Sequence, residues 1–149
     1  IMMAEHLKSS EDTLLRALMI SNLVALYEKH FIGKLSAFCG AISAAAAAGC
    51  AVGYLKGLND EQLKMVVINA LATAGGVICD GAKASCAAKI ASGLQAAFTG
   101  LHMAEKGFCF KHGDGIVGKD VDETIRSIGE IASIGMSPTN DVILDIMTR

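Results

Sequence analysis

Three cysteines, a carboxylate and an amine are the residues of this chain whose types and spacing could do chemistry. Cys79, Asp80, Lys83 and Cys86 lie in one short stretch, and Cys39 lies upstream in an Ala-rich segment. Each of the three cysteines is near a glycine or an expected helix start, where backbone N–H groups and the helix dipole favour a thiolate. Because the thiolate is the form of cysteine that binds metals, the three residues are candidate metal ligands.

The spacing of Cys79 and Cys86 leaves the metal interpretation open. Seven residues along one straight helix separate two Cα atoms by roughly 10 Å, which is wide for a compact metal centre. If Cys79 lies in a turn before the helix, the two sulfur atoms come closer, and Gly81 permits such a turn. Structural zinc usually takes a second Cys or His pair, and the chain has none with that spacing. Packing in an apolar core is therefore the alternative role for these cysteines.

The other two cysteines, Cys50 and Cys109, stand among apolar neighbours and are expected to be packing residues. Five cysteines are an odd number, which argues against a disulfide framework and for a reducing compartment. We therefore expect the protein to be cytoplasmic.

The composition predicts an all-α fold in one domain. The chain has 149 residues, of which 52% are hydrophobic, and Ala and Gly supply much of that fraction. Small side chains favour close helix packing, and we expect two buried, nearly uncharged Ala/Gly-rich helices at the centre. The net charge is −2 and the basic residues are scattered, so the pattern excludes a typical nucleic-acid-binding domain.

Cap residues and apolar periodicity predict about six helices to position the candidate site. They run from about 10 to 29, 34 to 56, 60 to 75, 82 to 106, 120 to 135, and from 137 toward the chain end. In the last helix Pro138 stands at the first position. Its apolar residues are expected to pack inward: Val142, Ile143, Ile146 and Met147.

Two patterns point to functions that we do not expect. The uncharged run 35–55 is long enough to cross a membrane, but Ala, Gly and Ser dominate it, so its transfer into lipid is weak. Gly113-x-Gly115-x-x-Gly118 matches a dinucleotide-binding pattern, which requires a strand before it and a helix after it in a βαβ unit. A helical chain offers no such unit.

Three stretches of the chain resemble one known family. They are Cys39-Gly40-Ala41, Ile78-Cys79-Asp80-Gly81-Ala82-Lys83-x-Ser85-Cys86-Ala87 and Gly115-Ile116-Val117-Gly118-x-Asp120-Val121-x-Glu123-Thr124-Ile125. Together they are similar to the alpha-type domain of bacterial iron–sulfur L-serine dehydratases, and within that group to the L-cysteine desulfidase branch. The resemblance covers nearly the whole chain.

The resemblance implies a cofactor and a reaction. Cys39, Cys79 and Cys86 would ligate a 4Fe–4S cluster, leaving one iron open as a Lewis acid. The implied reaction is β-elimination from L-cysteine or L-serine, which yields pyruvate and ammonia with sulfide or water. Lys83 is then a candidate for the substrate carboxylate, and Asp80 for a supporting role beside the cluster, with a plain helix N-cap as its alternative.

The chain also departs from the family's pattern. Members are much longer, so the resemblance implies that residues 1–149 are a C-terminal domain whose N-terminal partner domain supplies the catalytic base. We expect the chain alone to be inactive and to lose a cluster in air. The serine dehydratases carry a cysteine near the chain end, whereas this chain ends Ile146-Met147-Thr148-Arg149, which favours the desulfidase branch.

Two further interpretations remain at this stage. A second copy of the chain is a candidate partner, as a homodimer. A non-catalytic helical regulatory or oligomerisation module, with the cysteines as packing residues, is the alternative function.

Overall fold

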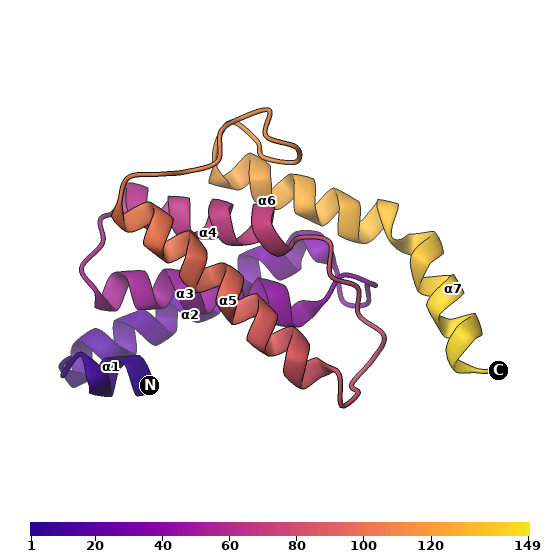
Figure 1. The fold of residues 1–149 in the computed structure, drawn as a ribbon, viewed down its shortest axis with the longest axis horizontal. Helices are drawn as coiled ribbons and strands as arrows, with labels where there is room; N and C mark the ends of the chain where they lie inside the picture. Colours follow the sequence, from indigo (N-terminus) through magenta and orange to yellow (C-terminus); the bar gives the residue numbers. More distant parts are fainter.

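The computed structural model describes all residues from Ile1 to Arg149 as a helical bundle without strands (Figure 1). Seven α-helices and one π-helical segment follow one another along the chain. They are α1 (Met2–His6), α2 (Glu11–Ile32), α3 (Gly40–Leu55), α4 (Asp60–Ala74), α5 (Cys86–Glu105), α6 (Val121–Glu130), η1 (Ile131–Gly135) and α7 (Ser137–Met147). The predicted all-α class is confirmed, and the short helix α1 was not predicted.

Side-chain caps begin three of the helices where the sequence indicated. Ser10 precedes α2 and its hydroxyl accepts a hydrogen bond from the Thr13 amide at 3.2 Å. Asn59 and Gln62 form a capping box at the start of α4, in which each side chain accepts from the other residue's amide. Asp120 caps α6 in the same manner as Ser10 caps α2. Satisfying these otherwise free amides explains why the helices begin at these residues.

Helix α3 lies at the centre, in contact with α2, α4 and α5, and carries no charged residue. Small residues let its neighbours approach closely. A Cβ atom added at Gly49 would lie 2.9 Å from the Cβ of Ala97, and one added at Gly93 of α5 would lie 3.1 Å from the Cβ of Ala45. The predicted close packing of two Ala/Gly-rich helices is confirmed, because larger side chains at these positions would push α3 and α5 apart. The prediction that both helices are buried is wrong for α5, which packs one face on α3 and α4 and exposes Ile90, Leu94 and Phe98 on the other.

Two central helices begin later than predicted. Helix α3 starts at Gly40 rather than near Lys34, and α5 starts at Cys86 rather than at Ala82. The reason is tertiary, because the segments before the two helices pair with each other and with neighbouring turns instead of extending the helices.

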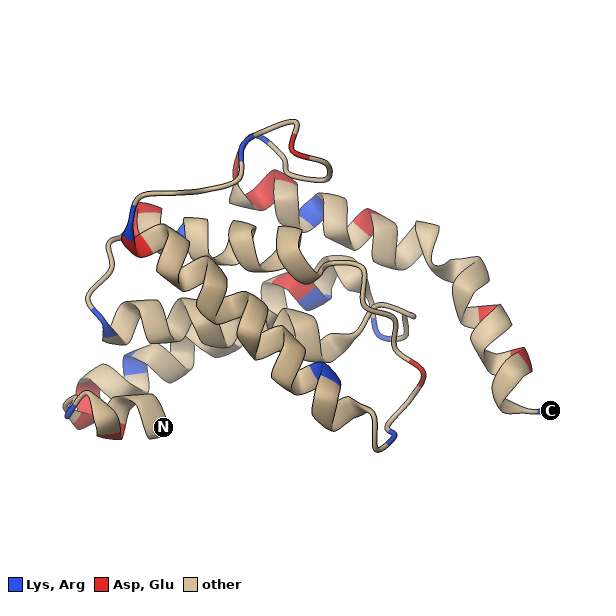
Figure 2. Cartoon of the chain, viewed as in Figure 1, with Lys and Arg blue, Asp and Glu red and all other residues tan.

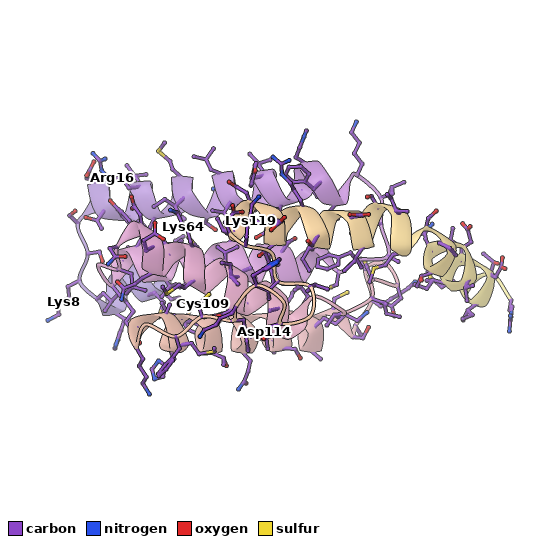
Figure 3. All side chains as sticks on the ribbon, turned by 90° about the horizontal axis from the view of Figure 1, so that it is seen from above. Lys8, Arg16, Lys64, Cys109, Asp114 and Lys119 are labelled. Atoms are coloured by element: carbon purple, nitrogen blue, oxygen red, sulfur yellow. The ribbon has the colours of Figure 1, made fainter.

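The prediction for the last helix is wrong. No residue of α7 is buried, and the side chains of Val142 and Ile146 are 57% and 58% exposed. Helix α7 projects beyond the bundle after the π-helical segment η1, as the two perpendicular views show (Figures 1 and 3). Its apolar residues follow helical spacing, but no other helix of the chain lies where it could cover them.

The segment 107–119 between α5 and α6 is a loop without a strand, so the glycine pattern within it has no βαβ unit around it. The buried side chain of Asn69 holds the start of this loop against α4. Its amide nitrogen donates to the Phe108 carbonyl oxygen and its oxygen accepts from the Phe110 amide, both at 3.0 Å. No helix of the chain is both long enough and apolar enough to cross a membrane.

Candidate functional site

A single antiparallel bridge joins the segments that carry Cys39 and Cys79. Phe38 pairs with Ile78, the Cys39 amide donates to the Val77 carbonyl oxygen at 3.0 Å, and the Cys79 amide donates to the Ala37 carbonyl oxygen at 2.5 Å. The two cysteines therefore flank the same rung, and the pleat directs their side chains to one face. Both contact the same hydrophobic core cluster. The fold thus brings together two predicted ligands that are far apart in the sequence.

Cys86 reaches the same end of the bundle through a tight turn. Gly81 adopts a φ of 83°, and the Cys86 amide then donates to the Lys83 carbonyl oxygen at 2.9 Å as α5 begins. The thiol of Cys86 donates to the Gly81 carbonyl oxygen at 3.4 Å. The arrangement matches the prediction that Cys79 precedes the helix, and Cys86 is its first residue.

Cys39 and Cys86 both occupy the positive ends of helices. Cys39 is the N-cap residue of α3, and Cys86 opens α5. Helix starts of this kind present free backbone amides, which donate hydrogen bonds to anionic groups. In Figure 1 the loops that lead into α3 and α5 converge on one side of the molecule, on the side toward α7.

The π-helical segment η1 accepts a hydrogen bond from the loop that precedes Cys39. The hydroxyl of Ser36 donates to the Ala132 carbonyl oxygen at 2.7 Å and accepts from the Phe38 amide at 3.0 Å. A π-helical segment shifts the backbone pairing of a helix, and such segments are frequent at functional sites. Ser36 therefore fixes the bridge residue Phe38 through a carbonyl of η1.

Lys89 is a site residue that the sequence interpretation missed. It forms an ion pair with Asp80, and its side chain is only 18% exposed. The hydrogen bond to Asp80 raises the pKa of Lys89, and the nearby thiols of Cys86 and Cys39 raise it further when ionised. A positive charge therefore lies close to two of the three predicted ligands. Its spacing of three residues from Cys86 on one helix was the available signal.

The start of α5 excludes one of the two predicted roles of Asp80, the helix N-cap. Asp80 does not cap α5, because the helix begins later and Ser85 is its N-cap residue. Instead, the hydrogen bond from Lys89 holds the pKa of the Asp80 carboxyl below its usual value, with a smaller contribution from the charge of Lys83. The side chain of Lys83 lies exposed on the turn between Gly81 and Cys86.

The donor set fits an iron–sulfur group in chemistry but is not a closed set of ligands. All five cysteines are free thiols, and three of them lie at one end of the bundle on separate segments. Iron–sulfur clusters are held by cysteine thiolates. No group of three or more His, Cys, Asp or Glu side chains is close enough to hold a single metal ion. The three thiols thus match the kind of ligand, with Cys86 turned to Gly81.

Comparison with a family model extends over almost the whole chain. The model described as serine dehydratase alpha chain matches residues 1–145. The chain belongs to the serine dehydratase alpha chain family. The prediction made from the three motif stretches is thereby confirmed at the level of the family.

Two relatives of the chain are both named UPF0597 protein. A UPF0597 protein of Lachnoclostridium phytofermentans is 50% identical over 137 residues, which are 92% of this chain and 33% of the relative. A UPF0597 protein of Treponema denticola is 46% identical over 149 residues, which are 100% of this chain and 35% of the relative. The chain therefore spans about a third of the length of these relatives. No solved structure matches the chain.

Proposed function

We propose that this chain is the cluster-bearing domain of a lyase that catalyses β-elimination from L-cysteine or L-serine. The products are pyruvate and ammonia, with sulfide from L-cysteine or water from L-serine. The observation that carries the proposal is the bridge between the Cys39 and Cys79 segments, with Cys86 at the adjacent helix start. Membership of the serine dehydratase alpha chain family supports the reaction class.

Cys39, Cys79 and Cys86 would hold a 4Fe–4S cluster. When bound, such a group supplies a Lewis-acidic iron for the leaving hydroxyl or thiol. Lys89 places a positive charge beside the ligand thiolates, and Asp80 holds Lys89 in place. The ion pair with Asp80 thus holds the ammonium of Lys89 at this end of the bundle.

Lys83 is the proposed contact for the substrate carboxylate. Its ammonium lies on the exposed turn between two of the ligand positions, and the structure shows no hydrogen bond or ion pair that occupies it. An ammonium in this place attracts a small anionic amino acid and orients it at the thiols. The base that removes the Cα proton belongs, in this proposal, to the part of the longer protein outside this chain, so the chain alone is inactive.

Anaerobic reconstitution with iron and sulfide tests the cofactor. Wild-type protein should gain visible thiolate-to-iron absorbance with four irons per chain, and Cys79→Ser should lose most of it. Cys50→Ser is the matched control, because Cys50 is equally a free thiol but is buried within α3. Absence of a cluster in the wild type, or an unchanged cluster in Cys79→Ser, contradicts the proposal.

Lys89→Gln tests the charge beside the ligands. The variant should load a cluster but release iron to a chelator several times faster than the wild type, because the thiolates lose their neighbouring cation. Lys64→Gln is the matched control, since Lys64 also pairs with a carboxylate, Glu61, but at the exposed start of α4. Equal rates of iron release in the two variants would show that Lys89 does not affect the cluster ligands.

The substrate is tested in a full-length relative, such as the Treponema denticola protein, with L-cysteine and L-serine while sulfide and pyruvate are measured. Substitution of the lysine position aligned with Lys83 by Ala should raise KM at least about tenfold, because one charge-assisted hydrogen bond is lost. A full-length protein that loads a cluster yet releases neither product contradicts the reaction.

One observation favours the non-catalytic module as a second candidate. The side chain of Cys39 is only 3% exposed and belongs to the main hydrophobic core cluster. In that case Ala substitutions at Cys39, Cys79 and Cys86 cost modest stability and bind no iron in any form. The reconstitution experiment separates the two functions.

A further inference from the structure

An apolar groove opens on the side of the bundle formed by α1, α2, α3 and α5. Its volume is about 640 Å³, and its lining includes Leu14 and Leu18 of α2, Val52 of α3, and Leu94 and Phe98 of α5. Ser21 supplies the only polar side chain in the lining, and no charged residue lines it. A hollow of this composition offers a polar ligand no hydrogen-bonding side chain except the Ser21 hydroxyl.

The groove continues into apolar surface on both of its sides. Leu18 also lines a second hollow, on the outer face of α2, together with Leu15, Met19 and Leu23. Leu94 and Phe98 also line a third hollow, on the outer face of α5. Met19 and Leu23 are 62% and 60% exposed. The groove and the hollow on α2 thus form one apolar surface, whereas the hollow on α5 also holds the polar side chains of Gln95, Thr99 and His102.

Charged residues avoid this surface. Figure 2 shows Lys, Arg, Asp and Glu mainly in loops and near helix ends, with long stretches of α3 and α5 free of them. Soluble monomers rarely leave contiguous apolar surface of more than a few hundred Å² uncovered. The surface therefore has the character of an interface from which the covering element is absent.

The first residues of the chain indicate what covers it. Ile1, Met2 and Met3 line the groove, and the side chains of Ile1 and Met2 are 71% and 82% exposed. Polypeptide joined to the amino group of Ile1 thus leaves the bundle inside the groove. About two thirds of the length of the curated relatives lies outside the matched segment. A covalently joined segment at this point has an effective concentration in the millimolar range, which a second copy does not have.

We propose that in the longer proteins of this family the groove is the docking surface for the polypeptide that precedes the segment matched by this chain. The covering element presents an apolar helix face, because Leu, Ile or Phe side chains at i, i+3, i+4 and i+7 fill a groove that lacks polar partners. The proposal rests on the proposed function, in which this chain is one domain of a longer lyase.

Side-chain footprinting tests the docking. Hydroxyl-radical labelling of the groove residues on α1, α2 and α5 is compared between this chain and the full-length Treponema denticola relative, both free of metal. We expect at least about fivefold less labelling of the aligned groove residues in the longer protein, because covered side chains do not meet solvent. Equal labelling in the two proteins overturns the proposal.

A matched pair of variants makes the result specific. In the longer protein, Asp at the position aligned with Phe98 should restore the labelling of the α2 groove residues. Asp at the position aligned with Val142, which is an exposed apolar residue of α7 outside the groove, should leave that labelling unchanged. Circular dichroism of Phe98→Asp and Val142→Asp in this chain checks that both fold. Restoration by both variants, or by neither, contradicts the proposal.

Sedimentation of this chain tests whether a second copy of the chain occupies the groove instead. A concentration-dependent dimer that Phe98→Asp dissociates would assign the groove to a second copy and overturn the proposal. Because every sample is free of metal, the result does not depend on the cluster: a covered groove with no cluster on reconstitution refutes the proposed function alone, and a loaded cluster with an uncovered groove refutes the docking alone.

Discussion

Cys50 and the cysteines at the converging loops show two environments for the same side chain. Cys50 lies in the middle of α3 and is 4% exposed. Burial raises the pKa of its thiol to about 11, with a further contribution from Glu28 on α2. Cys39 and Cys86 instead lie at helix starts beside Lys89. Position within the helix therefore separates an inert thiol from a candidate ligand.

Glu28 of α2 is an acidic residue in the same buried region as Cys50. Its carboxyl is 1% exposed, and neither of its oxygen atoms has a hydrogen-bond partner. Burial raises the pKa of the Glu28 carboxyl to about 9, so the group is neutral at pH 7. Asp80, which meets a lysine at the surface, shows the opposite direction, because the ion pair lowers the pKa of its carboxyl. A carboxyl paired with a lysine thus favours its charged form, whereas the unpaired carboxyl in the core favours its neutral form.

Thiol alkylation gives the largest expected difference. At pH 8 a thiol with a pKa of about 11 is only about one part in a thousand ionised, and the thiolate is the reactive form. In metal-free, reduced protein we expect iodoacetamide to modify Cys50 at least about 100-fold more slowly than the partly exposed Cys79 and Cys86. Peptide mass spectrometry over time measures the three rates, and similar rates would abolish the distinction.

Glu28→Gln should change the pH dependence of stability. Between the unfolded pKa near 4.5 and the folded pKa near 9, the native state holds a proton that the unfolded state has lost. Stability from this group is therefore complete below about pH 4.5 and falls as the pH rises, by roughly 1.4 kcal/mol per unit, until about pH 9. Between pH 5.5 and 7.5 the variant should lose about 3 kcal/mol less than the wild type.

Urea unfolding at each pH measures this difference. Glu130→Gln is the control, because it removes an exposed carboxylate of α6 rather than a buried one. Parallel curves for the wild type and Glu28→Gln would show that Glu28 is not held neutral in the core. The range stays below pH 8 so that the raised pKa of Cys50 does not contribute.

Glycine-to-alanine substitutions should give the smallest effect. They compare the packing around Gly129 in α6 with the packing around Gly40, the residue after Cys39. A Cβ at Gly129 in α6 would overlap the Cβ of Phe31 and lie 3.0 Å from its carbonyl carbon. Gly129→Ala should therefore cost about 1–3 kcal/mol by overpacking. Gly40, next to Cys39, has nothing within 4 Å of such a Cβ, so Gly40→Ala should be neutral or stabilise by up to about 1 kcal/mol. Equal losses in urea unfolding would contradict the contrast.

The sequence predicted the helices best where the signal is local. The caps at Ser10 and Asn59 were identifiable because a capping side chain bonds to an amide only two or three residues away. Asp120 was expected in the first turn of its helix and is instead the N-cap residue of α6. The close approach of α3 to its neighbours followed from the Ala and Gly content. By contrast, the starts of α3 and α5 were predicted too early, since their preceding segments are held by partners distant in the chain.

For the candidate site, the sequence predicted the residue types and the turn between Cys79 and the next helix, but it placed Cys39 and Cys86 within helices rather than at their starts. It did not predict the ion pair between Asp80 and Lys89, because nine residues that span a turn and a helix start have no fixed geometry in sequence alone. The prediction for α7 was wrong for a related reason. Apolar spacing shows which side of a helix is apolar, but not whether another part of this chain packs against that side.

The sequence by itself determined the all-helical class, the cap residues and a set of thiols at glycine-flanked positions, because each depends on neighbours within a few residues. Only the tertiary structure decided that the segments of Cys39 and Cys79 pair with each other, that Lys89 lies beside the thiols, and that Glu28 is buried without a partner. These contacts join separate helices and loops. Their formation depends on how α3 packs among its neighbours, which no short window of sequence contains.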